Sequence, residues 1–272
     1  MKTKIDLTVI IPVHSVADQN FNEMLNTALM SINNNEVQPS NVVIVRCGCG
    51  DVKEVLNELD MTKYDFEIDI LENQTGKQFQ NQINFAATQV TTKYFSFLEF
   101  DDEFSVKWFQ NVKTYTEAYP DVDMFIPIIS DVTTDNIFVG YTNEAAWAYN
   151  FSETLGHIDH EVLMQYPNIN PDGMVIKTDV FKSVGGYKPS MRFTFNYEFL
   201  LRFTNTGRTI MVIPKMGYKH VNMRPGSLFW NYKNNPEMKV EPDEAKFWIE
   251  TAQKEFYFTE DRNITYDVTP AE

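Results

Sequence analysis

The chain has 272 residues, of which 43% are hydrophobic, and this suffices for one large folded domain. Its formal net charge of −15 argues against nucleic-acid binding, because nucleic-acid-binding proteins present clustered Lys and Arg to the phosphates. No apolar run reaches the roughly 18 residues of a membrane span or resembles a signal-peptide core, so we expect a cytoplasmic protein without a transmembrane segment. Two cysteines, Cys47 and Cys49, are too few for a disulfide framework, and we interpret them as reduced thiols in a tight turn.

Strand-like and helix-like segments alternate through the first half of the chain, which is typical of βαβ units on a mostly parallel sheet. Continuous apolar runs predict the strands, and apolar residues at helical spacing predict the helices between them. The expected strands are 7–12, 41–45, 66–71, 94–98 and 124–129, and the expected helices are 21–32, 52–59, 79–87 and 106–119.

The regular pattern ends at Ser130. Residues 130–171 are polar, aromatic and irregular, and we expect them to form an acceptor loop or a lid. Regular patterns return with strands at 174–176 and 209–213, the second closed by Pro214, and with helices at 179–184, 195–204 and 242–256. No repeat or low-complexity linker interrupts the chain, so the sequence predicts a single α/β domain over residues 1–272.

The most informative stretch is the apolar run 94–98, which leads directly into Glu99, Asp101 and Asp102. In an open α/β sheet, ligands bind outside the carboxyl ends of the strands. Mg²⁺ and similar cations are held there by one or two carboxylates together with substrate phosphates. The stretch therefore predicts a divalent cation and a phosphorylated ligand. The alternative interpretation is that these acids only cap the following helix.

Seven short motifs follow one another along the chain. They are Val9-Ile10-Ile11-Pro12-Val13-His14, Asn41-Val42-Val43-Ile44-Val45, Asn73-Gln74-Thr75-Gly76 with Asn81, Leu98-Glu99-Phe100-Asp101-Asp102, Gly185-Gly186-Tyr187, Tyr197-Glu198-Phe199-Leu200-Leu201-Arg202 and Arg224-Pro225-Gly226-Ser227. In order and spacing they resemble the family 2 glycosyltransferases of the GT-A fold, over about residues 5–228. The resemblance implies a Rossmann-like nucleotide-sugar-binding half at 1–103, an acceptor-binding half at 104–228, and a C-terminal extension with a helix at 229–272.

The resemblance also implies an activity, the transfer of a sugar from a nucleotide diphosphate to an acceptor hydroxyl with the help of Mn²⁺ or Mg²⁺. Glu99 and Asp101 correspond to the family's Asp-x-Asp motif, so both are expected metal ligands, with Asp101 the direct one. His220 is expected to complete the metal shell. A metal that bridges the two phosphates neutralises charge as the glycosidic bond breaks.

Contacts to the nucleotide sugar are expected at the ends of the first strands, at a helix start and in a late loop that closes over the diphosphate. The residues are Pro12, Val13, His14, Cys47, Lys77, Asn81, Glu99, Phe100, Arg224 and Ser227. UDP is the family's usual nucleotide, but the family's acids after the second strand are replaced here by Arg46 and Cys47, which leaves the base open. Lys77 opposes the helix dipole, which is unfavourable unless an anion lies nearby.

The catalytic base is the main open question. Inverting members usually carry an Asp where this chain has Asn196, whose amide cannot take up a proton as a carboxylate does. Glu198 is the nearest substitute, although its spacing also suits an ion pair with Arg202, and Asp172 is the second candidate.

The leading hypothesis is an inverting, hexosyltransferase-type enzyme that moves a sugar from a UDP-sugar to a saccharide or lipid-linked saccharide. The alternative is a non-catalytic member of the family that binds nucleotide or saccharide in the same crevice, motivated by Asn196. The oligomeric state, the donor sugar and the acceptor stay open.

Overall fold

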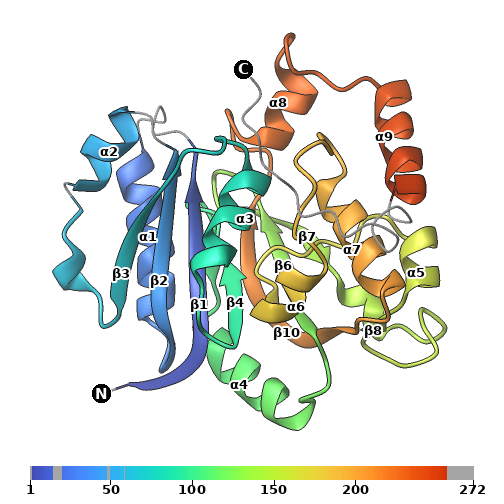
Figure 1. Ribbon diagram of the computed structural model, residues 1–272, viewed down its shortest axis with the longest axis horizontal. Coiled ribbons are helices and arrows are strands. Elements are labelled where there is room, and N and C mark those ends of the chain that lie inside the picture. The colour runs from blue at the N-terminus through green and yellow to red at the C-terminus, as the bar shows by residue number, and fades with distance from the viewer. Residues whose placement is uncertain (1, 15–19, 48–49, 58, 256–272) are drawn as a thin grey trace.

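The computed structural model describes residues 2–14, 20–47, 50–57 and 59–255 of the chain. Cys49, Ser15 and the end of the predicted last helix at Phe256 lie outside these ranges. The described residues form a central sheet with helices packed on both faces (Figure 1). The α/β class with a mostly parallel sheet, expected from the alternating patterns, is confirmed.

The sheet has the strand order β3-β2-β1-β4-β9-β6-β10-β5, and β7 pairs with β6 while β8 pairs with β10. Neighbours β1, β2, β3 and β4 are parallel, as are β6 and β10, whereas β9 runs antiparallel to both β4 and β6. The strands are β1 (Thr3–Val13), β2 (Val37–Cys47), β3 (Glu67–Asn73), β4 (Tyr94–Phe97), β5 (Glu103–Phe104), β6 (Met124–Val132), β7 (Phe138–Thr142), β8 (His157–Ile158), β9 (Val175–Lys177) and β10 (Ile210–Val221).

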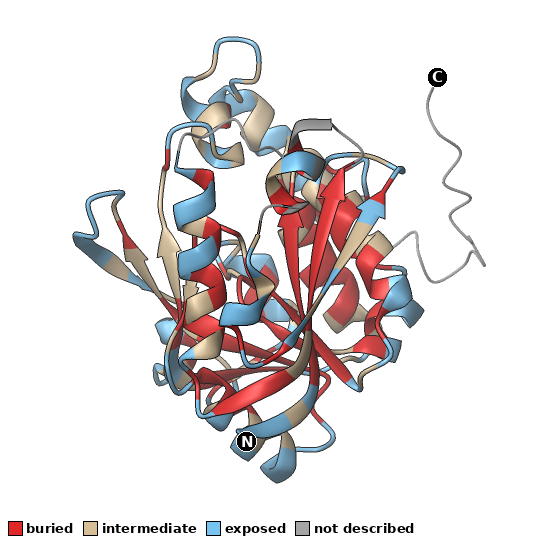
Figure 2. Ribbon diagram, turned by 90° about the vertical axis from the view of Figure 1, so that its left-hand side faces the viewer, coloured by how far each residue is buried: buried red, intermediate tan, exposed pale blue. Residues whose placement is uncertain are grey.

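Helices cover both faces because successive strand residues point to opposite sides. Val9 and Ile11 of β1 belong to the core shared with α1, α2 and α4, whereas Ile10 belongs to the core shared with α3, α6 and α7. The central strands are accordingly buried and the outer helix faces exposed (Figure 2). The helices are α1 (Phe21–Asn33), α2 (Gly50–Asn57), α3 (Phe79–Gln89), α4 (Trp108–Ala118), α5 (His160–Gln165), α6 (Thr178–Ser183), α7 (Phe195–Asn205), α8 (Leu228–Asn234) and α9 (Pro242–Glu255).

Two expectations about regular structure were wrong. Pro214 does not close the last strand, because β10 continues to Val221, and its pairing with β6 shifts register between Ile213 and Met216. An irregularity of this kind accommodates a residue that cannot donate a backbone hydrogen bond. The stretch 130–171 is not irregular throughout, since it contains the end of β6, β7, β8 and α5.

The acids after β4 do not cap the next helix. The N-cap of α4 is Lys107, whose side chain forms no capping hydrogen bond, and the first-turn N–H of Phe109 donates to Asn35 Oδ1 at 3.4 Å and not to one of these acids. The alternative interpretation of the acidic stretch is therefore wrong, and another role is needed for three carboxylates at the end of a buried strand.

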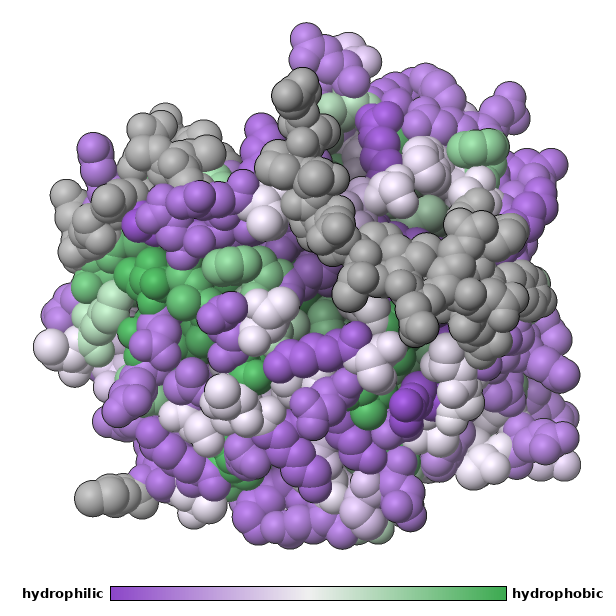
Figure 3. Space-filling model, viewed as in Figure 1, coloured by the Kyte–Doolittle hydropathy of each residue, from purple (hydrophilic) through white to green (hydrophobic). Residues whose placement is uncertain are grey.

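The surface seen in Figure 3 is largely hydrophilic, and its hydrophobic part lies mainly over β2 and β3. None of the helices in the described ranges is both long and apolar enough to cross a lipid bilayer.

Candidate active site

Ionisable side chains from four strands meet at one edge of the sheet. The carboxyl ends of β4, β6 and β10 lie there, and because β9 runs in the opposite direction, its beginning lies at the same edge. Residues from all four strands therefore come together although they are far apart in sequence. They are Glu99, Asp101 and Asp102 after β4, Asp131 on β6, Asp172 before β9 and His220 on β10.

Asp102 anchors the loop after β4 to β10. The hydroxyl of Tyr218 donates to its Oδ2 at 2.8 Å, and the backbone N–H of Val221 donates to its Oδ1 at 2.7 Å. The Tyr218 oxygen also accepts the backbone N–H of Glu99 at 3.2 Å. Burial raises the pKa of Asp102 to about 8, although the positive charge of His220 acts to lower it. Both oxygens of Asp102 are thus bonded to the protein, and its role is to fix the position of the neighbouring acids.

Glu99, which is half-buried, and Asp172, which is buried, are two carboxyl groups that face the same charges. Burial and the carboxylate of Asp172 raise the pKa of Glu99, and burial also raises the pKa of Asp172. Asn170 holds Asp172 in place, because its Nδ2 donates to Asp172 Oδ2 at 2.8 Å and its Oδ1 accepts the Asp172 N–H at 2.9 Å. Such crowded carboxyl groups lower each other's acidity, and a cation placed among them would relieve this repulsion.

His220 lies beside Asp131, with 3.0 Å between Nδ1 and Oδ1. Burial alone would lower the pKa of His220, but the Asp131 hydrogen bond and the carboxylates of Asp102 and Asp172 raise it to about 10. The ring is therefore an imidazolium near neutral pH. Because a metal-binding imidazole must be neutral, His220 would have to lose this proton before it could serve as the expected metal ligand.

Asp101, the expected direct metal ligand, is paired with a side chain from the loop after β10. Arg224 Nε donates to Asp101 Oδ2 at 2.6 Å, and the guanidinium lies 5.2 Å from the centre of the Phe100 ring. The His14 ring lies 6.0 Å from Phe100, and burial lowers the pKa of His14 while Asp101 opposes this shift. Cys47 Sγ is 3.8 Å from the carbonyl oxygen of His14, to which it donates. The structure thus brings these five expected site residues together.

The other expected nucleotide contacts lie at the margin of this group. Lys77 is exposed, and its charge helps to lower the pKa of His14, so the two are neighbours. Asn81 Nδ2 donates to Gln78 Oε1 at 2.8 Å beside the turn at Gly76.

Three further residues that were expected to contact the nucleotide sugar have structural roles. Ser227 caps α8 by accepting the N–H of Trp230, and Pro12 and Val13 are buried in β1, so that they can offer a ligand only backbone groups.

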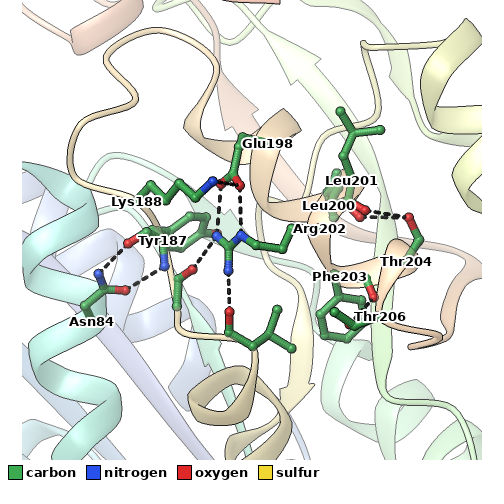
Figure 4. A network of polar contacts seen from close by, with 12 residues as sticks. Asn84, Tyr187, Lys188, Glu198, Leu200, Leu201, Arg202, Phe203, Thr204 and Thr206 are labelled. Atoms are coloured by element: carbon green, nitrogen blue, oxygen red, sulfur yellow. Dashed lines mark hydrogen bonds and ion pairs between the residues drawn. The ribbon is translucent and has the colours of Figure 1, made fainter. Parts of the chain in front are cut away.

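Glu198 does not lie with these acids. Its side chain is fully buried, and Arg202 Nε and Nη2 donate to its two oxygens at 2.8 and 2.9 Å (Figure 4). Lys188 Nζ forms a further ion pair with it at 2.8 Å. Arg202 also donates to the carbonyls of Val184 and Gly186. This placement argues against the expected role of Glu198 as catalytic base, because Arg202 and Lys188 engage both of its oxygens.

The Gly185-Gly186 turn connects this network of hydrogen bonds and ion pairs around Glu198 to α3. Gly186 has a φ of +63°, and a Cβ there would lie 2.4 Å from Asn84 Oδ1 of α3. Asn84 in turn bonds the backbone of Tyr187 in both directions, at 2.7 and 2.8 Å (Figure 4). The turn thus joins α3 of the first half to α7 of the second, and it fixes Tyr187.

Several residues of this edge were not anticipated from the sequence. Asp131 and Tyr218 went unnoticed because they lie beyond the predicted ends of their strands, and Asn170 lies in the stretch without a readable pattern. No continuous apolar run crosses Pro214, because Lys215 and Gly217 follow it, so no apolar pattern pointed to Tyr218. Asn196, at the position of the family's usual base, has a buried Oδ1 with no hydrogen-bond partner among the described residues.

The arrangement of strands and the acidic edge is that of a GT-A glycosyltransferase. The chain matches the model of Glycosyl transferase family 2 over residues 8–171, more than half of its length, and it belongs to that family. The resemblance noted in the sequence is thereby confirmed. None of the curated proteins compared with the chain matches it.

Solved structures support the same fold. S. aureus TarS 1–349 in complex with UDP-GlcNAc is similar at a TM-score of 0.63 and 16% identity, covering 96% of this chain and 68% of that one. The same TarS segment in complex with UDP is similar at a TM-score of 0.59 and 16% identity, covering 94% of this chain and 71% of that one.

Proposed function

We propose that this protein is a metal-dependent, inverting glycosyltransferase that moves a hexose-type sugar from a UDP-sugar to a saccharide or lipid-linked saccharide. The observation that carries the proposal is the meeting of Glu99, Asp101 and Asp172 with the cations His220 and Arg224 at the ligand-binding edge of a family 2 fold. The similarity to structures of TarS with UDP and UDP-GlcNAc supports the choice of nucleotide.

The residues present fit Mn²⁺ or Mg²⁺. Among the described residues, no three potential ligand side chains are preassembled around one point. This accords with an ion held by one or two carboxylates and the substrate's phosphates. Asp101 would hold the ion with Glu99, whose pKa is raised by burial and by the neighbouring carboxylates of Asp172 and Asp101. A bound ion supplies a Lewis acid to the diphosphate.

Two positively charged side chains, His220 of β10 and Arg224 of the following loop, would stabilise the leaving group. His220 contributes the charge of its imidazolium to the diphosphate, rather than a metal bond, as long as Asp131 keeps it protonated. Arg224 exchanges its bond to Asp101 for the phosphate oxygens when the nucleotide sugar binds, since a guanidinium can contact a phosphate with two donors at once. Both side chains offset the negative charge that appears on the departing UDP.

Asp172 is the proposed base. Burial raises the pKa of Asp172, which makes its carboxylate a stronger base, and Asn170 orients this carboxylate. The acceptor hydroxyl gives its proton to Asp172 as its oxygen bonds to the anomeric carbon. The bond from that carbon to the β-phosphate oxygen breaks, and its electron pair leaves with UDP. A single displacement of this kind inverts the anomeric configuration.

A nucleotide- or saccharide-binding protein without turnover is the second candidate. It is favoured by Asn196, which stands where the family's base usually lies, and by Arg46, which pairs with Glu72 at 2.9 Å. The usual base-recognising acids are therefore absent.

Calorimetry and a turnover assay separate the two candidates. The protein is titrated with UDP in the presence and absence of Mn²⁺, and nucleotide release from UDP- and GDP-sugars is measured with and without saccharide acceptors. We expect Mn²⁺-dependent binding of UDP and acceptor-stimulated release. Metal-dependent binding with no release from any sugar nucleotide would favour the binding protein.

A further inference from the structure

Asn143 is a buried residue between β7 and the 3₁₀ helix Glu144–Trp147, and its side chain forms three hydrogen bonds. Its Nδ2 donates to the carbonyl oxygen of Pro127 on β6 at 2.9 Å and to that of Asn170 at 2.8 Å. Its Oδ1 accepts the backbone N–H of Asn170 at 2.9 Å. The amide thus pairs with the backbone of Asn170 in both directions, as a neighbouring β-strand would. One side chain therefore joins β6 to the segment that precedes β9.

Neither the backbone conformation nor the following helix explains why this residue is Asn. Its φ of +74° lies in the left-handed region, which Gly adopts at lower cost. Asn143 is also the N-cap of the 3₁₀ helix, where an Asn side chain commonly accepts a backbone N–H, but here it forms no capping hydrogen bond. The amide is used instead for its contacts with Pro127 and Asn170.

Asn170 transmits this constraint to Asp172, the proposed base. The side chain of Asn170 donates to the Asp172 carboxylate and accepts the Asp172 N–H, through the two bonds described above. The backbone of Asn170 is the part that Asn143 holds. Two successive amide side chains therefore connect the carboxylate of Asp172 to β6.

The residue after Asp172 fits closely against the acidic edge. A Cβ at Gly173 would overlap the ring of Tyr218, whose hydroxyl is bonded to the loop after β4. Ser96 Oγ of β4 donates to the carbonyl oxygen of Gly173 at 3.3 Å. Asp172 is thus placed between two fixed neighbours, Asn170 on one side and Gly173 on the other, and a shift of Asn170 would move its carboxylate.

We propose that Asn143 is a positioning residue that holds the carboxylate of Asp172 in place through Asn170. The inference rests on the proposed function and deepens it, because it assigns a residue outside the acidic edge to the orientation of the base. Proton transfer from the acceptor requires the base within hydrogen-bond reach, so a small displacement of the carboxylate lowers the rate. Asn143 is only 4% exposed, and it acts on Asn170 rather than on a substrate.

Asn143→Gly tests this, because Gly adopts the left-handed conformation but lacks the amide. Asn150→Gly is the matched control, since Asn150 also has a positive φ, +67°, but is exposed. Turnover per folded molecule is measured with the UDP-sugar and saccharide acceptor that the wild type uses fastest, and UDP affinity by calorimetry with Mn²⁺. Asn143→Gly should lower kcat about tenfold to a hundredfold and leave UDP affinity unchanged. The control should match the wild type in both measurements.

A second background separates positioning from a general loss of structure. Asn170→Ala removes the side chain that reaches Asp172, so adding Asn143→Gly to it should lower kcat little further. The two losses should therefore be non-additive, as for residues that act in one network. Asn143→Asp keeps the size of the side chain and an acceptor for the Asn170 N–H. It takes the place of Asn143→Gly if the Gly variant does not fold, and it should likewise lower kcat with UDP affinity retained.

The inference is overturned if the Asn143 variant keeps the wild-type kcat, if kcat and UDP affinity fall together, or if its loss adds fully to that of Asn170→Ala. Asp172→Asn, measured in the same assay, tests the proposed base itself. If Asp172→Asn loses turnover and the Asn143 variant does not, only the positioning role is refuted. If Asp172→Asn keeps the wild-type kcat, or the wild type releases no nucleotide from any UDP-sugar, the proposed function fails and this inference fails with it.

Discussion

Replacing Glu198 by Gln tests whether this residue supports the fold or takes part in catalysis. The carboxylate is fully buried and carries two ion pairs, to Arg202 and to Lys188, so the substitution leaves two buried cations without their counterion. Removing one partner of a buried ion pair costs about 3–5 kcal/mol, and the lower end applies because Gln keeps the shape and one acceptor oxygen. At roughly 2–4 °C per kcal/mol for a domain of this size, the midpoint of thermal unfolding should fall by roughly 6–12 °C.

The assay combines thermal unfolding with turnover per folded molecule at a temperature where the variant is still native. Glu117→Gln is the matched control, because Glu117 pairs with Lys113 at 2.7 Å at the same i,i+4 spacing, although in the reverse order, on an exposed helix face. Exposed pairs contribute little, so this control should melt with the wild type. The reasoning is refuted if Glu198→Gln melts with the wild type but loses turnover by more than about a hundredfold, because proton transfer by a general base has that magnitude.

Three further predictions concern single side chains of the acidic edge. Asp172→Asn should lower kcat by about 10²- to 10⁴-fold with UDP binding retained, measured by nucleotide release, and unchanged kcat would exclude it as the base. Asp101→Ala should abolish the Mn²⁺ dependence of UDP binding in calorimetry while the protein stays folded; binding that still depends on Mn²⁺ would refute its role as ligand. Tyr218→Phe should lower the free energy of unfolding by about 1–3 kcal/mol in denaturant titrations, since Asp102 loses a buried donor, and no loss would contradict the anchoring role described above.

The strand and helix pattern was predictable because buried parallel strands are continuous apolar runs and their helices carry one apolar face. The strand beginning at Ile210 shows the limit of such patterns. A proline normally ends a strand, and only the register shift after Ile213 allows β10 to continue to His220. Strand β7 was missed for a different reason, since large hydrophobic side chains such as Phe138 and Tyr141 are exposed on it and give no alternation.

The candidate site was predictable only in its local part. The acids after β4 were visible because they follow one apolar run, and the ion pair of Glu198 with Arg202 followed from their spacing. The pairing of Asp101 with Arg224 joins residues far apart in the chain, and it depends on how β10 lies in the sheet. The periodicity of apolar residues in the sequence does not reveal a contact of this kind. Lys188, which completes the burial of Glu198, likewise comes from a separate turn.

Because β9 runs antiparallel to β4 and β6, the residue that it brings to the site comes from the connection before the strand and not from the loop after it. Residues from β1, β2 and β4 reach the edge as strands leave the sheet, but Asp172 reaches it as the chain enters β9. The segment that delivers the proposed base is thus the end of a long connection, bounded on one side by β7 and on the other by a strand of three residues. Part of that connection is fixed to β10, the strand that carries His220, because β8 pairs with Ile210 and Met211 and Trp147 Nε1 donates to the carbonyl oxygen of Val212 at 3.2 Å. If the proposed transfer is correct, a changed acceptor preference between relatives would be sought in exposed residues of this connection, such as 148–150 and 153–155, and not in an exchange of 144–169 as one piece.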